Sequence, residues 1–328
     1  MIRALGIRVP ATRALILLCA TPAVAQDIPF SLALPLDCVL NETCYIQQYA
    51  DRDPGPDATD FACGPLTYDT HSGTDFALPS LAMQAAGVTV HAAASGTVTG
   101  IRDDMSDLLQ GTAGAPDVTA RECGNGVVMQ HQDGWETQYC HMALGSVSVR
   151  PGDILLQGAP LGRVGLSGQT QFPHVHLSVR HNGADIDPFD PDQSLTCGQT
   201  APQLWADPLP YTPGGLISVG FSTAVPDYDA IKAGTATQAL TSASPGLVLW
   251  GFAYGGQPGD SLRITITGPR GEVITQTDPI DRIQAQFFRA AGKRVPARGW
   301  PPGDYTGTVD LIRNHAVIDS LTTQITLL

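Results

Sequence analysis

Short runs of Val, Ile and Leu, interrupted by glycine and other turn residues, recur along the chain and predict β-strands over most of its length. Between residues 67 and 190 they predict strands at 88–92, 96–101, 127–131, 136–141, 146–149, 151–155 and 161–165. Asp133 and Gly134 separate two of these strands and favour a hairpin turn. Segment 102–122 lacks the pattern, so we expect an insertion-like loop with one helical turn at 105–110. Loops of this kind often border a functional site.

The second half of the chain alternates in the same way, with strands expected at 246–250, 261–266, 303–311 and 322–327. Strands at this spacing, with turn residues between them, are typical of an Ig-like β-sandwich. We therefore predict an all-β chain. Its expected parts are a signal segment at 1–25, an extension at 26–66, a first β-domain at 67–200, a linker at 201–215 and a sandwich at 216–328.

The extension and the linker are expected to be irregular because both are rich in proline. Residues 26–66 also contain cysteines and are expected to pack as loops on the first domain. Within them, the acidic run 51–57 does not fit an EF-hand, since Gly55 stands where an oxygen ligand belongs and Pro56 where a glycine should turn the loop. We interpret this run as a solvated loop.

Residues 1–25 have the features of a secretory signal peptide. Three arginines precede the apolar run 14–20, and Ala23-Val24-Ala25 supplies the small-x-small pattern of a cleavage site. The run is too short to cross a bilayer, and no later segment is a transmembrane candidate. We expect an exported protein whose mature chain starts near Gln26.

Loss of that segment leaves six of the seven cysteines, and an even number in an exported chain argues for disulfides. These are Cys38, Cys44, Cys63, Cys123, Cys140 and Cys197. A bond between Cys38 and Cys44 would close a short loop, but six cysteines allow about 15 pairings and the connectivity stays open.

The formal net charge is −13, and removal of the three signal-segment arginines makes it −16. Only two lysines occur, Lys232 and Lys293, and there is no basic patch. This charge disfavours nucleic acids and anionic membrane surfaces as partners.

The residues that suggest chemistry are histidines and one carboxylate. His174 and His176 are two apart in a predicted strand, so both side chains lie on one face. His71 and Asp75 are four positions apart, with Gly73 between them, in what we expect to be a loop that leads into a strand. A His, Asp and His set suits Zn²⁺ with the fourth position left to water, as in catalytic zinc sites.

In combination, these motifs resemble the lysostaphin/LytM-type zinc metalloendopeptidases, which cut bacterial cell-wall peptides and have a duplicated hybrid motif fold. The matching motifs, in family order, are His71-Ser72-Gly73-Thr74-Asp75, Val90-His91-Ala92 with Gly96-Thr97-Val98, Gly124-Asn125-Gly126-Val127, Tyr139-Cys140-His141-Met142, Val149-Arg150-Pro151-Gly152, Gly165-Leu166-Ser167-Gly168, Pro173-His174-Val175-His176, Asn182-Gly183 and Asp187-Pro188.

The resemblance implies that His71, Asp75 and His176 bind zinc. It also implies that His141 and His174 line the metal without binding it, one as a base and the other as a stabiliser of the oxyanion; which is which stays open. Two positions depart from the family pattern: Met142 replaces a leucine, and Phe172 replaces a glycine.

The remaining candidates receive structural interpretations. We expect Cys140 to be half of a disulfide that braces its strand rather than a nucleophile. His91, His181 and His315 are expected to be solvated or structural, and His131 is a weak candidate for the rim of the site. We expect Asn125 to make a tight turn and Trp135 to pack in the core, rather than to contact substrate.

These inferences favour an exported, zinc-dependent endopeptidase that acts on murein cross-links or stem peptides, in the periplasm or outside a bacterium. One alternative is a catalytically silent cell-wall-binding or regulatory module of the same fold. Such relatives lose zinc ligands, whereas all five site residues are present here. A second alternative is an enzyme that cuts a non-murein peptide such as a glycine-rich extracellular protein. The sandwich is a candidate for contact with the cell wall or another protein, and the sequence does not indicate an oligomeric state.

Overall fold

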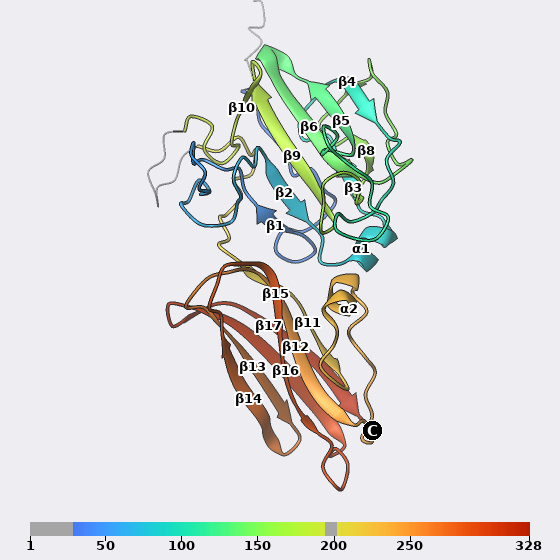
Figure 1. Ribbon diagram of the computed structural model, residues 1–328, viewed down its shortest axis with the longest axis vertical. Coiled ribbons are helices and arrows are strands. Elements are labelled where there is room, and N and C mark those ends of the chain that lie inside the picture. The colour runs from blue at the N-terminus through green and yellow to red at the C-terminus, as the bar shows by residue number, and fades with distance from the viewer. Residues whose placement is uncertain (1–28, 194–201) are drawn as a thin grey trace, which may run out of the picture.

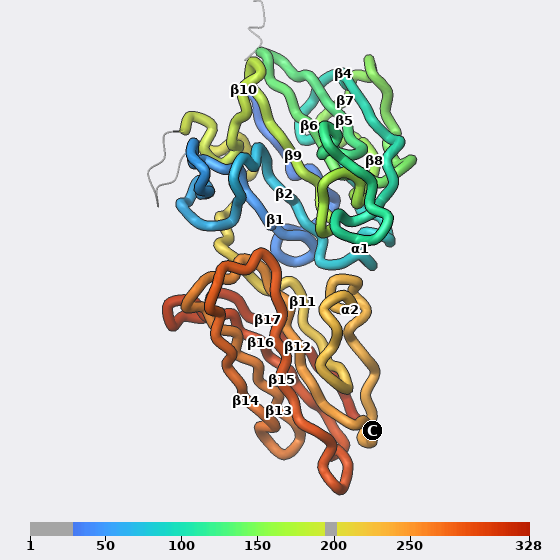
Figure 2. The backbone as a smooth tube through the Cα atoms, viewed as in Figure 1, coloured from blue at the N-terminus to red at the C-terminus, as the bar shows by residue number. Residues whose placement is uncertain are grey.

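The computed structural model describes residues 29–193 and 202–328. Antiparallel strands form two bodies that follow each other along the long axis of the molecule (Figures 1 and 2). The predicted all-β class is therefore confirmed. The predicted signal segment and Cys197 lie outside the described residues. Among the described residues, no helix is both long and apolar enough to cross a membrane.

The first body is built on an eight-stranded antiparallel sheet whose central strands carry the histidine motifs. Its order is β1 (Tyr45–Gln48), β2 (Thr74–Ala77), β9 (His174–His181), β6 (Trp135–Met142), β5 (Asn125–Gln130), β4 (Gly96–Arg102) and β7 (Ile154–Leu155), with β10 (Ala184–Asp185) paired to β9. A second sheet pairs β3 (Thr89–His91) with β8 (Pro160–Arg163). In β9 the alternation predicted from sequence holds, since Val175, Leu177 and Val179 are all fully buried.

The predicted hairpin joins β5 to β6. Asp133 and Gly134 both have positive φ, at 54° and 79°, within the short 3₁₀ segment Gln132–Gly134. Glycine adopts this region without steric penalty, and Asp is among the few other residues that tolerate it. The turn sequence therefore determines where the two strands reverse.

Three local predictions were wrong. Residues 105–110 contain no helical turn, because the side chain of Asn125 pairs with both backbone groups of Met105, at 2.8 and 2.7 Å. Residues 146–149 form no strand, because the amide of Val147 donates to Asp103 instead of to a neighbouring strand. Residues 45–48 are not loop but strand β1, because Tyr45 and Ile46 are buried against β2.

The second body is the predicted β-sandwich. One sheet has the order β11 (Gly215–Ser222), β12 (Gly246–Gly256) and β15 (Gln284–Arg294). The other has the order β14 (Gly271–Pro279), β13 (Ser261–Gly268), β16 (Gly303–Arg313) and β17 (Ala316–Leu327). Fully buried residues from both sheets, such as Leu249, Ile264 and Val309, form the core between them.

The two bodies share an apolar core. Trp250, Phe252 and Tyr254 of β12 belong to the same buried cluster as the residues behind the first sheet. Helix α1 (Leu81–Ala86) of the first body contacts α2 (Tyr228–Ala233) of the second (Figure 1). Trp205, in the predicted linker, is buried and packs against Phe76. The boundary between the bodies is therefore packed, and the sandwich is held in a fixed position beside the first sheet.

Candidate metal centre

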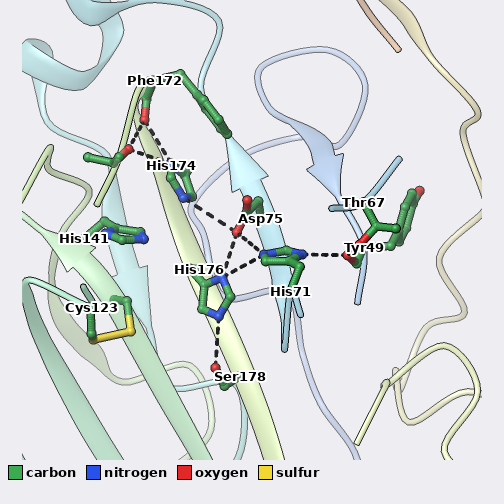
Figure 3. A network of polar contacts seen from close by, with 12 residues as sticks. Tyr49, Thr67, His71, Asp75, Cys123, His141, Phe172, His174, His176 and Ser178 are labelled. Atoms are coloured by element: carbon green, nitrogen blue, oxygen red, sulfur yellow. Dashed lines mark hydrogen bonds and ion pairs between the residues drawn. A yellow bond between two sulfur atoms is a disulfide. The ribbon is translucent and has the colours of Figure 1, made fainter. Parts of the chain in front are cut away.

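Strands β2 and β9 are neighbours in the sheet, and their register brings the two sequence motifs together. Asp75 is the direct Cα partner of His176, and Nδ1 of His176 lies 2.8 Å from Oδ1 of Asp75. His71, in the loop before β2, places its Nε2 3.2 Å from the same oxygen and 3.1 Å from Nδ1 of His176. The three atoms form one cluster (Figure 3), and ligand atoms of these residues all lie within 4.8 Å of one another.

The outer nitrogens of the two rings are anchored. Nδ1 of His71 lies 2.6 Å from the carbonyl oxygen of Tyr49, and Nε2 of His176 lies 3.0 Å from Oγ of Ser178. A carbonyl only accepts, so Nδ1 of His71 carries the proton and, in the neutral ring, Nε2 presents its lone pair to the cluster. Such contacts fix the orientation and tautomer of metal-binding histidines.

Gly73 allows strand β9, with the ring of His176, to come close to the loop that carries His71. A Cβ atom at position 73 would lie 2.6 Å from both Nε2 of His176 and the carbonyl oxygen of Leu177. Any side chain there would displace the ring or the strand. The glycine of the His-x-Gly-x-Asp motif is therefore required by the close approach of β9.

The chemistry of the cluster fits a divalent cation. A carboxylate oxygen and two imidazole nitrogens face one another at 2.8–3.2 Å, and lone pairs so close require a proton or a metal ion between them. In tetrahedral zinc sites, ligands at their usual distances from the ion are about 3.3 Å apart. The spacing and the N, N, O donor set thus fit Zn²⁺ with one further position left for water.

The electrostatics agree with this fit. Burial by itself would raise the pKa of Asp75, but His71 and His174, with hydrogen bonds from His176 and His71, hold it well below its usual value. Burial by itself would lower the pKa of His71, but Asp75, together with the carbonyl of Tyr49 and the charge of Asp51, raises it. The site thus keeps a buried negative charge that attracts a cation.

Two more imidazoles face the cluster from the other side. His174 lies on β9, and its Nε2 is 3.6 Å from Oδ1 of Asp75. His141 is near the end of β6, with its ring centroid 4.5 Å from that of His174 (Figure 3). Neither is in the group of three residues whose ligand atoms converge.

Both rings are held in the tautomer that leaves Nε2 unprotonated. Nδ1 of His141 lies 2.8 Å from the carbonyl oxygen of Ser167, and Nδ1 of His174 lies 2.9 Å from that of Phe172. Burial lowers the pKa of both rings, and for His141 the neighbouring His174 and His176 lower it further. Both are therefore neutral near pH 7, with a lone pair on Nε2 available to accept a proton.

His141 also has an unusual backbone. Its φ is +63°, in the left-handed region that residues other than glycine seldom adopt. Its amide donates to the carbonyl of Cys123 at 2.8 Å, and its carbonyl accepts from the amide of Gly165 at 2.9 Å. The preceding residue, Cys140, is disulfide-bonded to Cys123. The backbone of His141 is thus held in a strained conformation from both sides, as is common at functional sites.

The predicted roles of the cysteines agree with the structure where it describes them. Cys140 is a half-cystine, and Cys38 is bonded to Cys44. Cys63 is also disulfide-bonded.

Asn125 and Met142 have structural roles, whereas Phe172 lies beside the candidate metal centre. Asn125 is fully buried and, besides Met105, bonds Met142, so it braces the loop 102–122 rather than making a tight turn. Met142 is itself fully buried. Phe172, in contrast, stacks on His174 with ring centroids 4.3 Å apart and lines the cleft in front of it.

The other histidines lie outside the cluster. His131 bonds Ser95 and Thr137 and is buried, so its proposed position at the rim was wrong. His181 stacks on the half-buried Trp135, and His91 bonds the carbonyl of Gly158. The sequence did not indicate the supporting groups of Tyr49, Ser167 and Ser178, whose contacts depend on the tertiary fold. Nor did it indicate Thr170, whose Oγ1 lies 3.1 Å from Nδ1 of His174.

Comparison with known proteins agrees with this site. Residues 69–188 match peptidase family M23. Over 125 residues, the chain is 30% identical to the DD-carboxypeptidase/endopeptidase Mpg of Neisseria meningitidis, covering 37% of this chain and 23% of that protein. It is 25% identical over 122 residues to the peptidoglycan DD-endopeptidase ShyB of Vibrio cholerae, with the same coverage of each chain, 37% and 23%. The match thus spans only 23% of the length of each of these relatives.

Similar solved structures include a zinc containing peptidase from Vibrio cholerae, with a TM-score of 0.33 and 21% identity, over 48% of this chain and 39% of that chain. A peptidase M23 protein from Pseudomonas aeruginosa gives a TM-score of 0.30 and 25% identity, over 51% and 52% of the two chains.

Proposed function

We propose that this chain is a zinc-dependent endopeptidase that hydrolyses peptide bonds in peptidoglycan cross-links or stem peptides. The match of residues 69–188 to peptidase family M23 supports the proposal. The observation that carries the proposal is the convergence of His71, Asp75 and His176, with two neutral imidazoles beside them. The substrate class is supported by the name of one relative, the peptidoglycan DD-endopeptidase ShyB.

In this proposal His71, Asp75 and His176 hold the ion, and His141 and His174 act on the substrate. Zinc, when bound, supplies a Lewis acid and lowers the pKa of water at its open position. Nε2 of His141 and of His174 each accepts a proton or, once protonated, donates a hydrogen bond to the oxyanion of the tetrahedral intermediate. The carbonyls of Ser167 and Phe172 orient the two rings throughout, since each holds Nδ1.

Export to the periplasm or the cell exterior is the second part of the proposal. It is supported by the signal-like residues 1–25 and by disulfides such as Cys123–Cys140, which form and persist in oxidising compartments. Fractionation of cells that express the full chain tests it. Reduced, uncleaved protein in the cytoplasm would contradict it.

The alternative, a silent module, is disfavoured because none of the five side chains is replaced. The test is digestion of purified sacculi by zinc-loaded protein, with mass spectrometry of the released peptides. We expect solubilised fragments with cleaved cross-links or stems from the wild type and none from His174→Ala. A zinc-loaded wild type that binds sacculi but leaves them, soluble murein peptides and glycine-rich peptides intact would show a non-catalytic module.

A further inference from the structure

The candidate centre opens into a cleft of about 870 Å³ whose walls come from both bodies of the molecule. Asp75, His141 and His174 line it on the side of the first body. On the opposite side it is lined by Ile283, Gln284 and Gln286, at the start of β15 in the sandwich. A substrate that reaches the centre through this cleft therefore passes along the sandwich.

The sandwich wall is held in place by direct hydrogen bonds across the boundary. Nε2 of Gln47 donates to the carbonyl of Ala285 at 2.9 Å. Nε2 of Gln286 donates to Oε1 of Gln47 at 3.0 Å and to the hydroxyl of Tyr45 at 2.9 Å. Together with the shared apolar core, these contacts fix β15 beside β1. The cleft is thus a permanent feature of the fold.

The cleft adjoins an apolar recess of about 340 Å³ that also lies between the two bodies. Leu78, Leu109 and Phe172 line it from the first body, and Phe252 and Ala233 line it from the second. Neither body encloses the recess by itself. Both cavities are also lined by the ion pair of Lys232 and Asp229, 2.9 Å apart on α2.

The polar groups of the cleft suit a peptide backbone. Glutamine side chains from β1, from the segment 169–171 and from β15 line it, and amides both donate and accept hydrogen bonds. Oε1 of Gln48 is buried and has no donor within the described structure. A buried acceptor without a partner is unfavourable, and a peptide N–H would satisfy it.

We infer that the C-terminal β-sandwich is part of the substrate-binding site, and that it binds an extended peptide strand along Ile283–Gln286 with an aliphatic portion in the recess. The inference rests on the proposed function and extends it, since it assigns specificity to a domain that the peptidase match does not cover. The continuity of the cleft with the centre argues for the substrate strand as the occupant.

Ile283 and Val295 provide a matched test, because they flank the same strand β15 at its two ends. Ile283 is 62% exposed and lines the cleft, whereas Val295, at 36%, does not. With a soluble murein peptide as substrate, we expect Ile283→Ser to raise KM about tenfold and leave kcat within about twofold, from lost apolar contact. Val295→Ser should leave both unchanged, and melting curves verify that each variant is folded. Equal KM values for Ile283→Ser and wild type would overturn the inference.

The two lysines provide a test that does not depend on turnover. Lys232 lines the cleft and Lys293 is exposed at the distal end of β15, so one molecule carries both probe and control. In zinc-loaded His174→Ala protein, a soluble murein peptide should slow amine labelling of Lys232 several-fold and leave Lys293 unchanged. Equal rates with and without the peptide would overturn the inference even for an active enzyme. A wild type without peptidase activity would instead overturn the proposed function.

Discussion

Nδ1 of His176 and Oδ1 of Asp75 are 2.8 Å apart because the two residues are direct partners on adjacent strands. The register of β2 against β9 therefore determines the donor set, and a slip by one residue would turn His176 to the other face. His71 joins them through the short loop before β2. The geometry of the candidate metal centre is thus set by ordinary strand pairing and one close approach at Gly73.

Gly73→Ala should abolish zinc binding, because its Cβ would lie 2.6 Å from Nε2 of His176. Gly100→Ala is the matched control, since a Cβ there meets nothing within 4 Å. Metal content after dialysis measures the effect. Full zinc occupancy in Gly73→Ala would show that the ring does not need this approach.

His141→Ala should keep its zinc and lose activity by about 10²- to 10⁴-fold, the usual contribution of a positioned acid or base. His141 lines the cleft, but it is outside the group of converging ligands. His91→Ala, whose ring bonds a carbonyl of the chain, should retain wild-type activity. An active His141→Ala enzyme would remove this residue from the mechanism.

The disulfide beside His141 should affect both stability and rate. Replacing Cys123 and Cys140 by serine opens a loop with a sequence separation of 17, which corresponds to about 3 kcal/mol of unfolding free energy. It should also lower kcat, because the amide of His141 is bonded to Cys123.

Replacing Cys38 and Cys44, a separation of 6, should cost about 2 kcal/mol and leave kcat unchanged. Denaturant titration and steady-state kinetics of the two double variants make the comparison. Equal kcat values for wild type and the Cys123/Cys140 variant would disprove the role of this bond in positioning His141.

Much of this arrangement was predictable from local sequence patterns. The alternation in β9 placed His174 and His176 on one face, and the Asp133-Gly134 turn located the β5–β6 hairpin. Convergence with His71 and Asp75 came from the family resemblance, because pairing of strands about 100 residues apart has no local signal. The anchoring carbonyls of Tyr49, Ser167 and Phe172 were not predictable, since any residue supplies a carbonyl and only the fold decides which one faces a ring.

The predictions that failed did so where tertiary contacts replace local preference. The expected helical turn at 105–110 is absent because Asn125, from another strand, takes the backbone groups of Met105. Tyr45 and Ile46 lie in a proline-rich segment yet extend the sheet, since pairing with β2 buries both. The cleft between the bodies was not predicted, because it depends on how the sandwich packs against β1.

Stability should fall as the pH rises from about 4 to about 7 because of Asp187. Burial raises its pKa from 3.8 to about 7, and its Oδ2 has no donor within the described residues. In this range the unfolded carboxyl ionises while the folded one stays protonated, so ionisation favours unfolding until the pH passes the folded pKa.

Asp187→Asn removes this dependence, so its stability relative to wild type should increase with pH, by at most about 4 kcal/mol at pH 8. Denaturant unfolding at pH 4, 6 and 8 measures the difference. A constant difference between the two proteins across these pH values would contradict the raised pKa.

Zinc content and sacculus digestion, measured together on wild type, Asp75→Ala and His174→Ala, test the central claim most directly. We predict one zinc ion per chain and digestion for the wild type, neither for Asp75→Ala, and zinc without digestion for His174→Ala. Loss of zinc from His174→Ala with its retention in Asp75→Ala, or digestion by metal-free wild type, would contradict the assignment of ligands and catalytic groups.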